Sequence, residues 1–580
     1  MTQNATETPS IPTLEEMQHW TWVFGRAQQM MLEQGLDLLE PAPDTTPFGT
    51  LLDPTPAMRA AADFWADSLQ LWQRFLDPEH AVPFTETPEQ ARDKRFRAPE
   101  WRADPIFDFI RQSYFTIADH LLKGVDALEG VDEKQKEQMR FATRGFIDAI
   151  SPSNFPTTNP EVLAKTVETG GENLLKGLQH MLADLGKGQL TQSTPDAFEV
   201  GRDLATTPGK VVKRTDLYEL IQYTPTTESV FTVPVIIFPP WINRFYILDL
   251  TPEKSFIRWA VDQGLTVFVV SWRSADASMK DVVWDDYVER GQIDAIDTVR
   301  DLLKVDHVHA IGYCVAGTTL AATLAVLAAR DQADKVASAT FFTAQVDFAD
   351  AGELQMFVTD DQLAMIRNLA ADGFLDGRYM AATFNLLRGR DLIWNYVTNN
   401  YLLGQDYAPF ELLHWNSDVT NLPVNWHLSY LTDLYRDNRL VVPGSLAIDG
   451  TPVDLTRVHT PSYIQAGRED HIAPPSSVWK ITDHFKGPLR FVLAGSGHIA
   501  GVVNPPSAGK YQYWTHDAPV DTLAEFVAGA TETKGSWWPD WLGWIETIDS
   551  SRTAPKGGRV PGKGALKSLA EAPGLYVRTR

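Results

Sequence analysis

Apolar residues recur along this chain in two different patterns, and the change from one to the other divides it. Residues 14–39 and most of 61–185 carry apolar side chains at helical spacing. After residue 201, short apolar runs bounded by Gly and Pro are typical of buried strands. The pattern therefore predicts a helical N-terminal domain over residues 1–200 and a strand-rich domain over residues 201–580.

Strands and helices alternate in the second domain. The expected strands are the apolar runs at residues 211–214, 218–223, 233–238, 266–271, 309–311, 462–466 and 489–493. Helical stretches at 286–303 and 318–330 separate some of them. This order predicts a mainly parallel sheet, because parallel strands need crossover connections. The strand pattern lapses over about 347–457, and we expect this insertion to be a cap whose aromatic residues form mostly its own core.

The two ends of the chain leave alternatives open. The helix expected over residues 14–39 carries Trp20, Phe24, Met31 and Leu32, and it either packs on the protein or docks on an apolar surface. A basic segment closes the chain, with Lys556, Arg559, Lys563, Lys567, Arg578 and Arg580. We expect a solvated tail there, with docking on an acidic partner or on the acidic body as the alternatives.

Composition narrows the class of protein. With 580 residues, 44% of them hydrophobic and 22% charged, the chain can bury a large core. A formal net charge of -24 argues against nucleic-acid binding, which needs basic side chains. One cysteine allows no intrachain disulfide, in agreement with a reducing cytoplasm. The first residues lack a signal-peptide pattern, and the apolar stretch at 230–242 is too short to span a membrane.

That cysteine, Cys314, is the first candidate for chemistry. It lies in Gly-Tyr-Cys-Val-Ala-Gly, between an apolar strand-like run and an Ala-rich helical run. This pattern is typical of a nucleophile elbow above an α/β-hydrolase sheet, and a cysteine there suits attack on thioesters. Ala316 stands where the usual motif has glycine, and a methyl group is small enough for that place. The alternative is a small buried hydrophobe.

Two later loops supply the partners of the cysteine. Asp470 and His498 each follow an apolar strand, and with Cys314 they give the α/β-hydrolase order of nucleophile, acid and histidine. His498 would take the thiol proton, and Asp470 would orient the imidazole. Glu469 is the alternative acid, and we interpret His471 as a structural neighbour. We therefore expect a Cys-His-Asp triad.

An oxyanion formed during the attack needs two hydrogen-bond donors. One is expected from the backbone N–H of Val315, directly after the nucleophile. The other is expected from Trp241 or Ile242, in the loop after an early strand. No metal site is expected.

Several longer strings go beyond a general hydrolase pattern. They lie at residues 101–114, 238–250, 271–279, 415–423, 467–472, 496–506 and 535–541. Together they closely resemble the poly(3-hydroxyalkanoate) synthases over nearly the whole chain. The Tyr-Cys-Val elbow and the Asp-Ala-Ser-Met string resemble the class I enzymes, which favour short-chain monomers. Trp241 departs from the pattern, since some relatives have a smaller residue there.

The resemblance implies an acyltransferase. It would polymerise (R)-3-hydroxyacyl-CoA, chiefly (R)-3-hydroxybutyryl-CoA, into a polyester and release CoA. The resemblance also implies a homodimer on the surface of cytoplasmic polyester granules, where granule-associated proteins are further partners. Cys314 would hold the growing acyl chain, His498 would activate it, and Asp470 would assist His498 or the incoming hydroxyl. CoA enters as part of the substrate, and no cofactor is expected.

Two other functions use the same residues differently. A thioesterase or depolymerase would admit water to the triad, and a granule-coating protein would keep the fold without turnover. Arg388 is a weak candidate for contact with CoA phosphates, against the alternative of an ordinary ion-pair partner. A single thiol favours chain growth at one site over transfer between two subunits.

Overall fold

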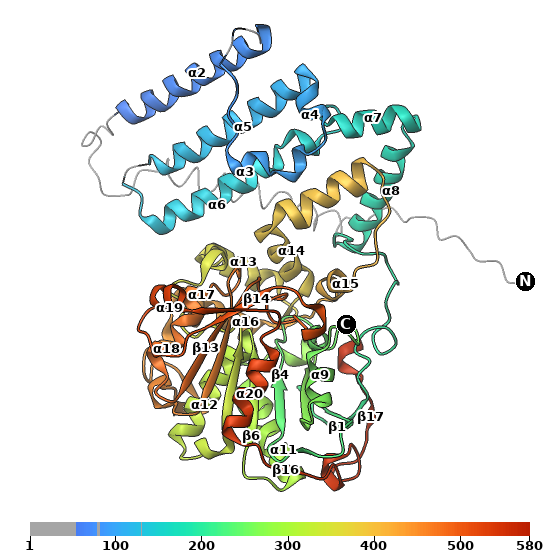
Figure 1. Cartoon of the computed structure of the whole chain (residues 1–580), viewed down its shortest axis with the longest axis vertical. Helices are drawn as coiled ribbons and strands as arrows, with labels where there is room; N and C mark the ends of the chain where they lie inside the picture. The colour runs from blue at the N-terminus through green and yellow to red at the C-terminus, as the bar shows by residue number, and fades with distance from the viewer. Residues whose placement is uncertain (1–53, 78–79, 81, 129, 580) are drawn as a thin grey trace, which may run out of the picture. The chain divides into compact units, whose positions relative to one another are not determined.

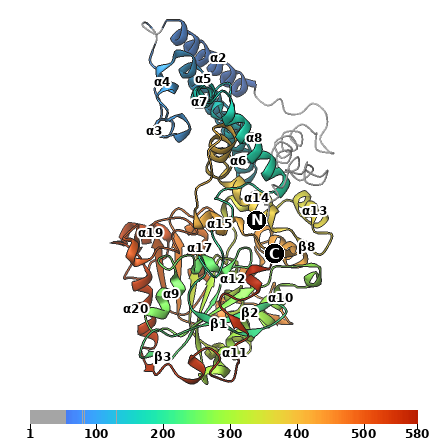
Figure 2. The same cartoon turned by 90° about the vertical axis from the view of Figure 1, so that its right-hand side faces the viewer.

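The computed structural model describes residues 54–77, 80, 82–128 and 130–579, so the helix expected over 14–39 lies outside the described residues. The chain divides into two compact units (Figures 1 and 2). Unit 1 combines Met1–Thr194 with Ala382–Ala408, and unit 2 combines Pro195–Ala381 with Pro409–Arg580. The stretch expected as a cap is therefore divided between the two units.

Unit 1 is helical. Its helices are α2 (Pro54–Leu76), α3 (Pro88–Ala91), α4 (Glu100–Ala103), α5 (Pro105–Asp126), α6 (Glu133–Ala149), α7 (Pro160–Thr169) and α8 (Glu172–Lys187). Short helical segments η1 (Lys94–Phe96), η2 (Pro152–Asn154), η8 (Arg390–Trp394) and η9 (Val397–Leu402) join them, together with the end of α14 (Gly377–Leu387). Side-chain caps begin several of these helices: for example, Asp104 accepts the N–H of Ile106 before α5, and Asn159 accepts that of Glu161 before α7.

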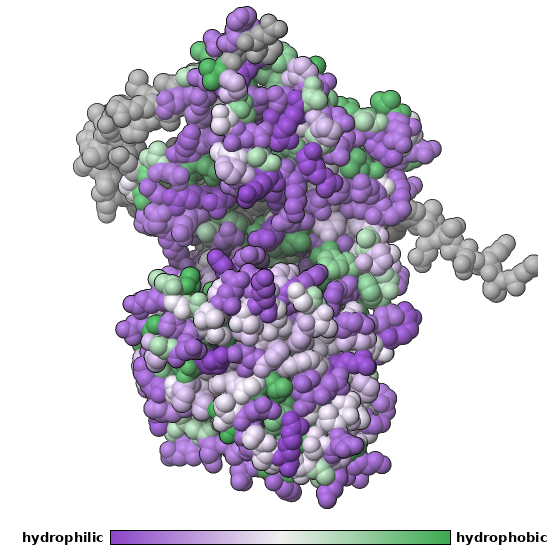
Figure 3. Space-filling model, viewed as in Figure 1, coloured by the Kyte–Doolittle hydropathy of each residue, from purple (hydrophilic) through white to green (hydrophobic). Residues whose placement is uncertain are grey.

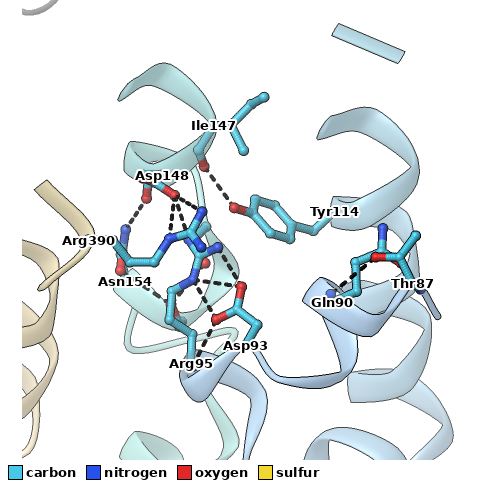
Figure 4. A network of polar contacts seen from close by, with 11 residues as sticks. Thr87, Gln90, Asp93, Arg95, Tyr114, Ile147, Asp148, Asn154 and Arg390 are labelled. Atoms are coloured by element: carbon cyan, nitrogen blue, oxygen red, sulfur yellow. Dashed lines mark hydrogen bonds and ion pairs between the residues drawn. The ribbon is translucent and has the colours of Figure 1, made fainter. Parts of the chain in front are cut away.

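A network of charged side chains connects Arg390, the first residue of η8, to the N-terminal helices (Figure 4). Asp148, at the end of α6, lies 3.0 Å from Arg95 Nη1 and 2.9 Å from Arg390 Nη2. Arg95 also donates to Asp93 at 2.7 Å. Burial would raise the pKa of Asp93, but its bonds with Arg95 outweigh burial and lower it. Residues far apart in sequence are thus held together by one shared carboxylate.

A cleft of about 720 Å³ opens beside this network in unit 1. Its charged lining consists of Arg92, Lys94, Arg95, Arg97 and Arg390 with Glu89, Asp93, Glu161 and Asp391. Five cations against four carboxylates leave almost no net charge. The electrostatic potential of the cleft therefore favours neither an anionic nor a cationic ligand.

An 11-stranded sheet runs through unit 2, within the described residues, in the order β15-β14-β13-β12-β7-β6-β4-β5-β2-β1-β17. Its parallel centre consists of β5 (Val267–Trp272), β4 (Val235–Phe238), β6 (Val308–Tyr313), β7 (Val336–Phe342), β12 (Ser462–Gly467) and β13 (Leu489–Ala494). Antiparallel strands flank it, namely β1 (Gly209–Arg214), β2 (Tyr218–Tyr223), β14 (Gln512–Thr515), β15 (Thr531–Lys534) and β17 (Ala570–Glu571). All the strands expected from the sequence belong to this sheet.

Further strand pairs lie outside the large sheet: β3 (Val230–Phe231) with β16 (Arg552–Thr553), β8 (Phe374–Leu375) with β9 (Leu422–Pro423), and β10 (Ala447–Ile448) with β11 (Thr451–Pro452). The helices of unit 2 are α9 (Phe256–Asp262), α10 (Trp284–Asp286), α11 (Asp294–Leu303), α12 (Val315–Ala329), α13 (Asp360–Leu369), α15 (Glu411–Ser417), α16 (Val424–Ser429), α17 (Pro475–Trp479), α18 (Ile481–His484), α19 (Leu523–Gly529) and α20 (Trp538–Ile548). The expected helix at 286–303 is only partly regular, because η5 (Tyr287–Ile293) is a π-helical turn between α10 and α11.

Two buried cores lie on the opposite faces of the sheet. Alternate residues of β4 divide between them: Ile236 and Phe238 join the core with α11 and α12, while Val235 and Ile237 join the core with α9 and α20. A strand directs successive side chains to opposite faces, so both faces of a central strand must be apolar. The fold class expected from the sequence is confirmed.

The basic C-terminal segment lies against unit 2, so the expectation of a solvated tail is wrong. β17 pairs with β1, and Val577 is buried. Arg559 is also buried, and its guanidinium donates to the carbonyls of Phe231 and Thr232 at 3.1 and 2.6 Å. For Arg559 the acceptors include these backbone carbonyls rather than carboxylates.

The face shown in Figure 3 is mostly hydrophilic, and hydrophobic residues stand out on unit 1 near α7. On α7 and α8 the exposed apolar side chains are Leu163, Val167, Leu175, Leu178, Met181 and Leu182. Val167 is 83% exposed and Leu175 61%. These two helices thus present more apolar surface than their own packing uses.

We predict that Asp148→Ala loosens unit 1 around residues 390–402. Arg95, whose side chain is only 11% exposed, and Arg390 lose their shared acceptor, which costs about 1–3 kcal/mol. Amide hydrogen exchange in that segment should become faster. The control is Glu168→Ala, because its pair with Lys165 is exposed and is worth under about 1 kcal/mol. Equal exchange in the two variants would contradict the role given to Asp148.

Candidate active site

Cys314 lies on a tight turn between a strand and a helix. β6 ends at Tyr313 and α12 begins at Val315, so the cysteine is the single residue between them. Its φ of 53° and ψ of −127° are unusual for a residue other than glycine. This turn places the thiol at the carboxyl end of a central parallel strand, which is the geometry of a nucleophile elbow.

Two glycines make the turn possible. A Cβ atom on Gly312 would lie 2.5 Å from the Cα of Gly317, and one on Gly317 would lie 2.4 Å from the Cβ of Ala344. Neither position has room for a side chain. Ala316 is buried beside them, and its carbonyl accepts a hydrogen bond from Gln292 at 2.9 Å. The close contact between β6 and α12 therefore requires a glycine at position 317, whereas position 316 has room for alanine.

Asp470 and His498 come together from the loops after β12 and β13. These strands are parallel neighbours, so their carboxyl ends meet at one edge of the sheet. Asp470 Oδ2 lies 2.7 Å from His498 Nδ1, and both side chains are buried. Its other oxygen accepts the backbone N–H groups of Ile472 and Ala473 at 2.8 and 2.9 Å. Glu469, the alternative acid, is exposed.

The charges around His498 favour its protonated form. Burial would lower the pKa of the imidazole, but the charge of Asp470, the neighbouring Cys314 and the hydrogen bond with Asp470 raise it to about 10. His498 is hydrogen-bonded to Asp470, and Cys314 lies near enough to contribute to the same shift. The structure thus brings the three residues of the expected triad into one neighbourhood.

The N–H groups expected to bind an oxyanion have no competing acceptor. Within the described part of the chain, the backbone N–H groups of Val315, Trp241 and Ile242 donate to no other protein group. Val315 is the first residue of α12, where N–H groups are left without partners inside the helix. Trp241 and Ile242 follow β4, the parallel neighbour of β6. All three N–H groups are available as hydrogen-bond donors.

Aromatic side chains surround this end of the sheet. Trp241 stacks on Tyr287, with 4.0 Å between the ring centroids, and its edge meets Trp426 at 5.1 Å. Burial, the neighbouring Tyr435 and then Cys314 raise the pKa of Tyr430. Burial and then Cys314 raise that of Tyr435. Both tyrosines belong to the stretch whose aromatic residues were expected to form the core of a cap, and they lie close enough to Cys314 to be affected by it.

Sequence reasoning also missed the residues that hold the loop after β4. The Thr420 hydroxyl lies 2.7 Å from the Trp241 carbonyl and 2.6 Å from that of Ile242. Arg244 is buried and donates to the carbonyl of Val419 at 3.2 Å. The strings at 238–250 and 415–423 were both noticed in the sequence, but nothing in either one indicates that they contact each other.

The remaining expectations concern Arg388, metal binding and membrane spanning. Arg388 belongs to unit 1 and is exposed, with its guanidinium 3.9 Å from the carboxylate of Asp391. Among the described residues, no group of three or more His, Cys, Asp or Glu is placed to hold a metal ion. None of the described helices is both long and apolar enough to cross a membrane.

The fold and the site define a class, the α/β-hydrolase superfamily with a cysteine at the elbow. In agreement, residues 234–505 match the family model of the alpha/beta hydrolase fold. Residues 92–260 match the model described as "Poly-beta-hydroxybutyrate polymerase (PhaC) N-terminus". The second match extends from the helices of unit 1 through β4, the first strand of the parallel centre, into α9 of unit 2.

Curated relatives cover most of the chain. A poly(3-hydroxyalkanoate) polymerase subunit PhaC of Rhizobium meliloti (strain 1021) is 45% identical over 91% of this chain and 87% of its own length. A poly(3-hydroxyalkanoate) polymerase of Methylorubrum extorquens is 44% identical over 91% and 88%. The subunit PhaC of Cupriavidus necator is 42% identical over 89% and 87%. The chain belongs to the poly(3-hydroxyalkanoate) polymerase family and is a transferase, which confirms the resemblance drawn from its sequence.

We predict that Gly317→Ala destabilises unit 2. The new methyl group would press on Ala344 and on the Gly312 carbonyl, 2.8 Å away, at a cost of about 1–3 kcal/mol. Gly543→Ala in α20 is the matched control, because nothing lies within 4 Å of its Cβ position and alanine favours the helix by about 0.5–1 kcal/mol. Urea unfolding followed by tryptophan fluorescence measures both. A harmless Gly317→Ala would mean that the close approach is not needed.

A second prediction concerns pH. The pKa of His498 is about 10 in the fold and about 6.5 when unfolded, so its pair with Asp470 stabilises the protein fully below pH 6.5. That contribution declines as pH rises from 6.5 to 10. The difference in unfolding free energy between the wild type and Asp470→Asn should therefore be larger at pH 6 than at pH 9.5. A difference that grows with pH would refute the charged pair.

Proposed function

We propose that the protein polymerises (R)-3-hydroxyacyl-CoA, chiefly (R)-3-hydroxybutyryl-CoA, through an acyl-enzyme on Cys314. The observation that carries the proposal is the hydrogen-bonded pair of His498 and Asp470 next to Cys314, which lies at the elbow of a chain from this polymerase family. A thiolate is a good nucleophile toward thioesters, and the charged imidazole beside it stabilises the thiolate.

The reaction has two halves. In the first, Cys314 Sγ bonds to the acyl carbonyl carbon, and the carbon–sulfur bond to CoA then breaks. His498 gives its proton to the departing CoA thiolate. In the second, His498 takes the proton from the 3-hydroxyl of the next acyl group, whose oxygen attacks the acyl-cysteine thioester. The bond between the acyl carbon and Cys314 Sγ then breaks, and the cysteine leaves as a thiolate beside the protonated imidazole. An oxygen ester replaces a thioester, so the second half is the favourable one.

Backbone donors stabilise the negative oxygen in both halves. The N–H of Val315 and one N–H of Trp241 or Ile242 are free to bind it. The aromatic side chains around Trp241 form a poorly hydrated wall, which favours attack by a hydroxyl over attack by water. CoA enters and leaves with the substrate, and the scheme requires no resident cofactor or metal.

We also propose that the protein works in the cytoplasm at the surface of the polyester granule. The exposed apolar side chains of α7 and α8 support contact with an apolar surface. Granule-associated proteins and a second copy of the chain are the expected partners. One thiol per chain supports growth at one site, since transfer between thiols would require two subunits.

The test is to give the purified full-length protein (R)-3-hydroxybutyryl-CoA and to follow free CoA and insoluble polyester by chromatography. We expect both products from the wild type. Cys314→Ala should release at least about 1,000-fold less CoA, because the nucleophile is lost. Its circular dichroism should match the wild type. Soluble 3-hydroxybutyrate as the sole product would indicate a thioesterase and overturn the proposal, and absence of turnover would indicate a coating protein.

A further inference from the structure

The loop after β4 is held in place through its carbonyl groups. The Thr420 hydroxyl lies within hydrogen-bond distance of the Trp241 and Ile242 carbonyls, at 2.7 and 2.6 Å. In a planar trans peptide the C=O and the following N–H point in opposite directions. Fixing the Trp241 carbonyl therefore fixes the direction of the Ile242 N–H, away from Thr420. Of the two candidate donors in this loop, Ile242 is the one whose direction this contact determines.

Arg244 links the same loop to two distant segments. Its own carbonyl accepts the indole N–H of Trp415 at 2.8 Å, and its guanidinium donates to Val419 O at 3.2 Å. The guanidinium also donates to the carbonyls of Tyr576 and Thr579, at 3.1 and 2.9 Å. It is almost fully buried, at 2% exposure. One side chain thus joins the loop to the segment before Thr420 and to the C-terminal segment.

Independent contacts fix the C-terminal segment. The buried Glu219 carboxylate accepts the N–H groups of Leu575 and Tyr576 at 2.8 and 2.9 Å. The Tyr576 hydroxyl donates to Thr215 O at 2.5 Å, and Val577 is buried. These contacts hold the Tyr576 carbonyl in place for Arg244.

Little space is left between these segments. The cavity that Trp241, Arg244, Thr420 and Val577 help to line has a volume of about 10 Å³, which is room for one water molecule at most. Movement of the C-terminal segment would therefore displace Trp241, because there is no space to absorb it.

We propose that residues 575–579 position the loop that carries the oxyanion donors, and that Arg244 is the positioning residue that connects them. The inference rests on the proposed acyl transfer by Cys314. A hydrogen-bond donor for an oxyanion must be held in advance, because a displaced donor stabilises the transition state less. Lysine cannot replace this arginine, since a single ammonium lacks the planar set of five donors that reaches several acceptors at once.

The test compares two reactions of Cys314. Acylation by p-nitrophenyl acetate passes through an oxyanion, whereas alkylation by iodoacetamide does not. We expect Arg244→Lys, and a chain ending at Val577, to acylate at least about 10-fold more slowly than the wild type. Alkylation should stay within about twofold. A merely structural defect would slow both reactions in parallel, and unchanged acylation would also overturn the proposal.

Further variants make the comparison specific. Arg300→Lys is the matched control, because Arg300 also donates to a backbone carbonyl, that of Asp306, but lies on α11 outside the site. It should behave as the wild type. Thr420→Val should slow acylation alone, and Thr420→Ser should restore it. These variants test the loop even if Arg244→Lys does not fold.

The last experiment combines the two changes and asks whether their effects on the acylation rate add. Shortening the chain to Val577 in the Arg244→Lys background should cost less than twofold more, because both changes affect the bond between residue 244 and the Thr579 carbonyl. Full additivity would contradict a shared path. The acetate ester separates this inference from the proposed function. A wild type that acylates but makes no polyester would refute the polymerase proposal alone, whereas an Arg244→Lys variant that acylates normally would refute the positioning role alone.

Discussion

The close approach of β6 and α12 at Gly312 and Gly317 is the constraint on which the active site depends. Without it the backbone could not make the turn that leaves Cys314 at a positive φ. The turn gives the thiol its place at the carboxyl edge of the sheet. It also leaves the first N–H of α12 without a partner in the helix. Nucleophile and oxyanion donor therefore come from one local feature.

Around that feature, burial and charge act against each other. A buried imidazole should lose its proton, yet Asp470 and Cys314 reverse the effect for His498. Two backbone N–H groups bind the second oxygen of Asp470 and so fix its carboxylate in the direction of His498. The buried Tyr313 ring lies next to the imidazole, with 5.7 Å between the ring centroids, and such apolar surroundings strengthen these interactions.

The sequence allowed much of unit 2 to be predicted, for a physical reason. Its central strands are buried on both faces, so each is a short apolar run, and Asp470 and His498 follow two of them directly. Chain order and the parallel rule then bring the triad together. Contacts between segments far apart in the chain leave no comparable pattern in the sequence. The grouping of Ala382–Ala408 with unit 1 depends on contacts such as Asp148 with Arg390, 242 residues apart, and the pattern of either segment does not report its partner.

The two sides of the oxyanion site therefore have different origins. The Val315 N–H is set by local chain geometry at the elbow, whereas the loop of Trp241 and Ile242 is held by residues far along the chain. Arg244 reaches Val419 across 175 residues and Tyr576 across 332. Contacts at such separation are established only when most of the unit has folded, because their loop-closure entropy must first be overcome. The nucleophile can thus be correctly built in a chain whose second oxyanion donor is still misplaced, so the fold of unit 2 and its catalytic competence are separable properties.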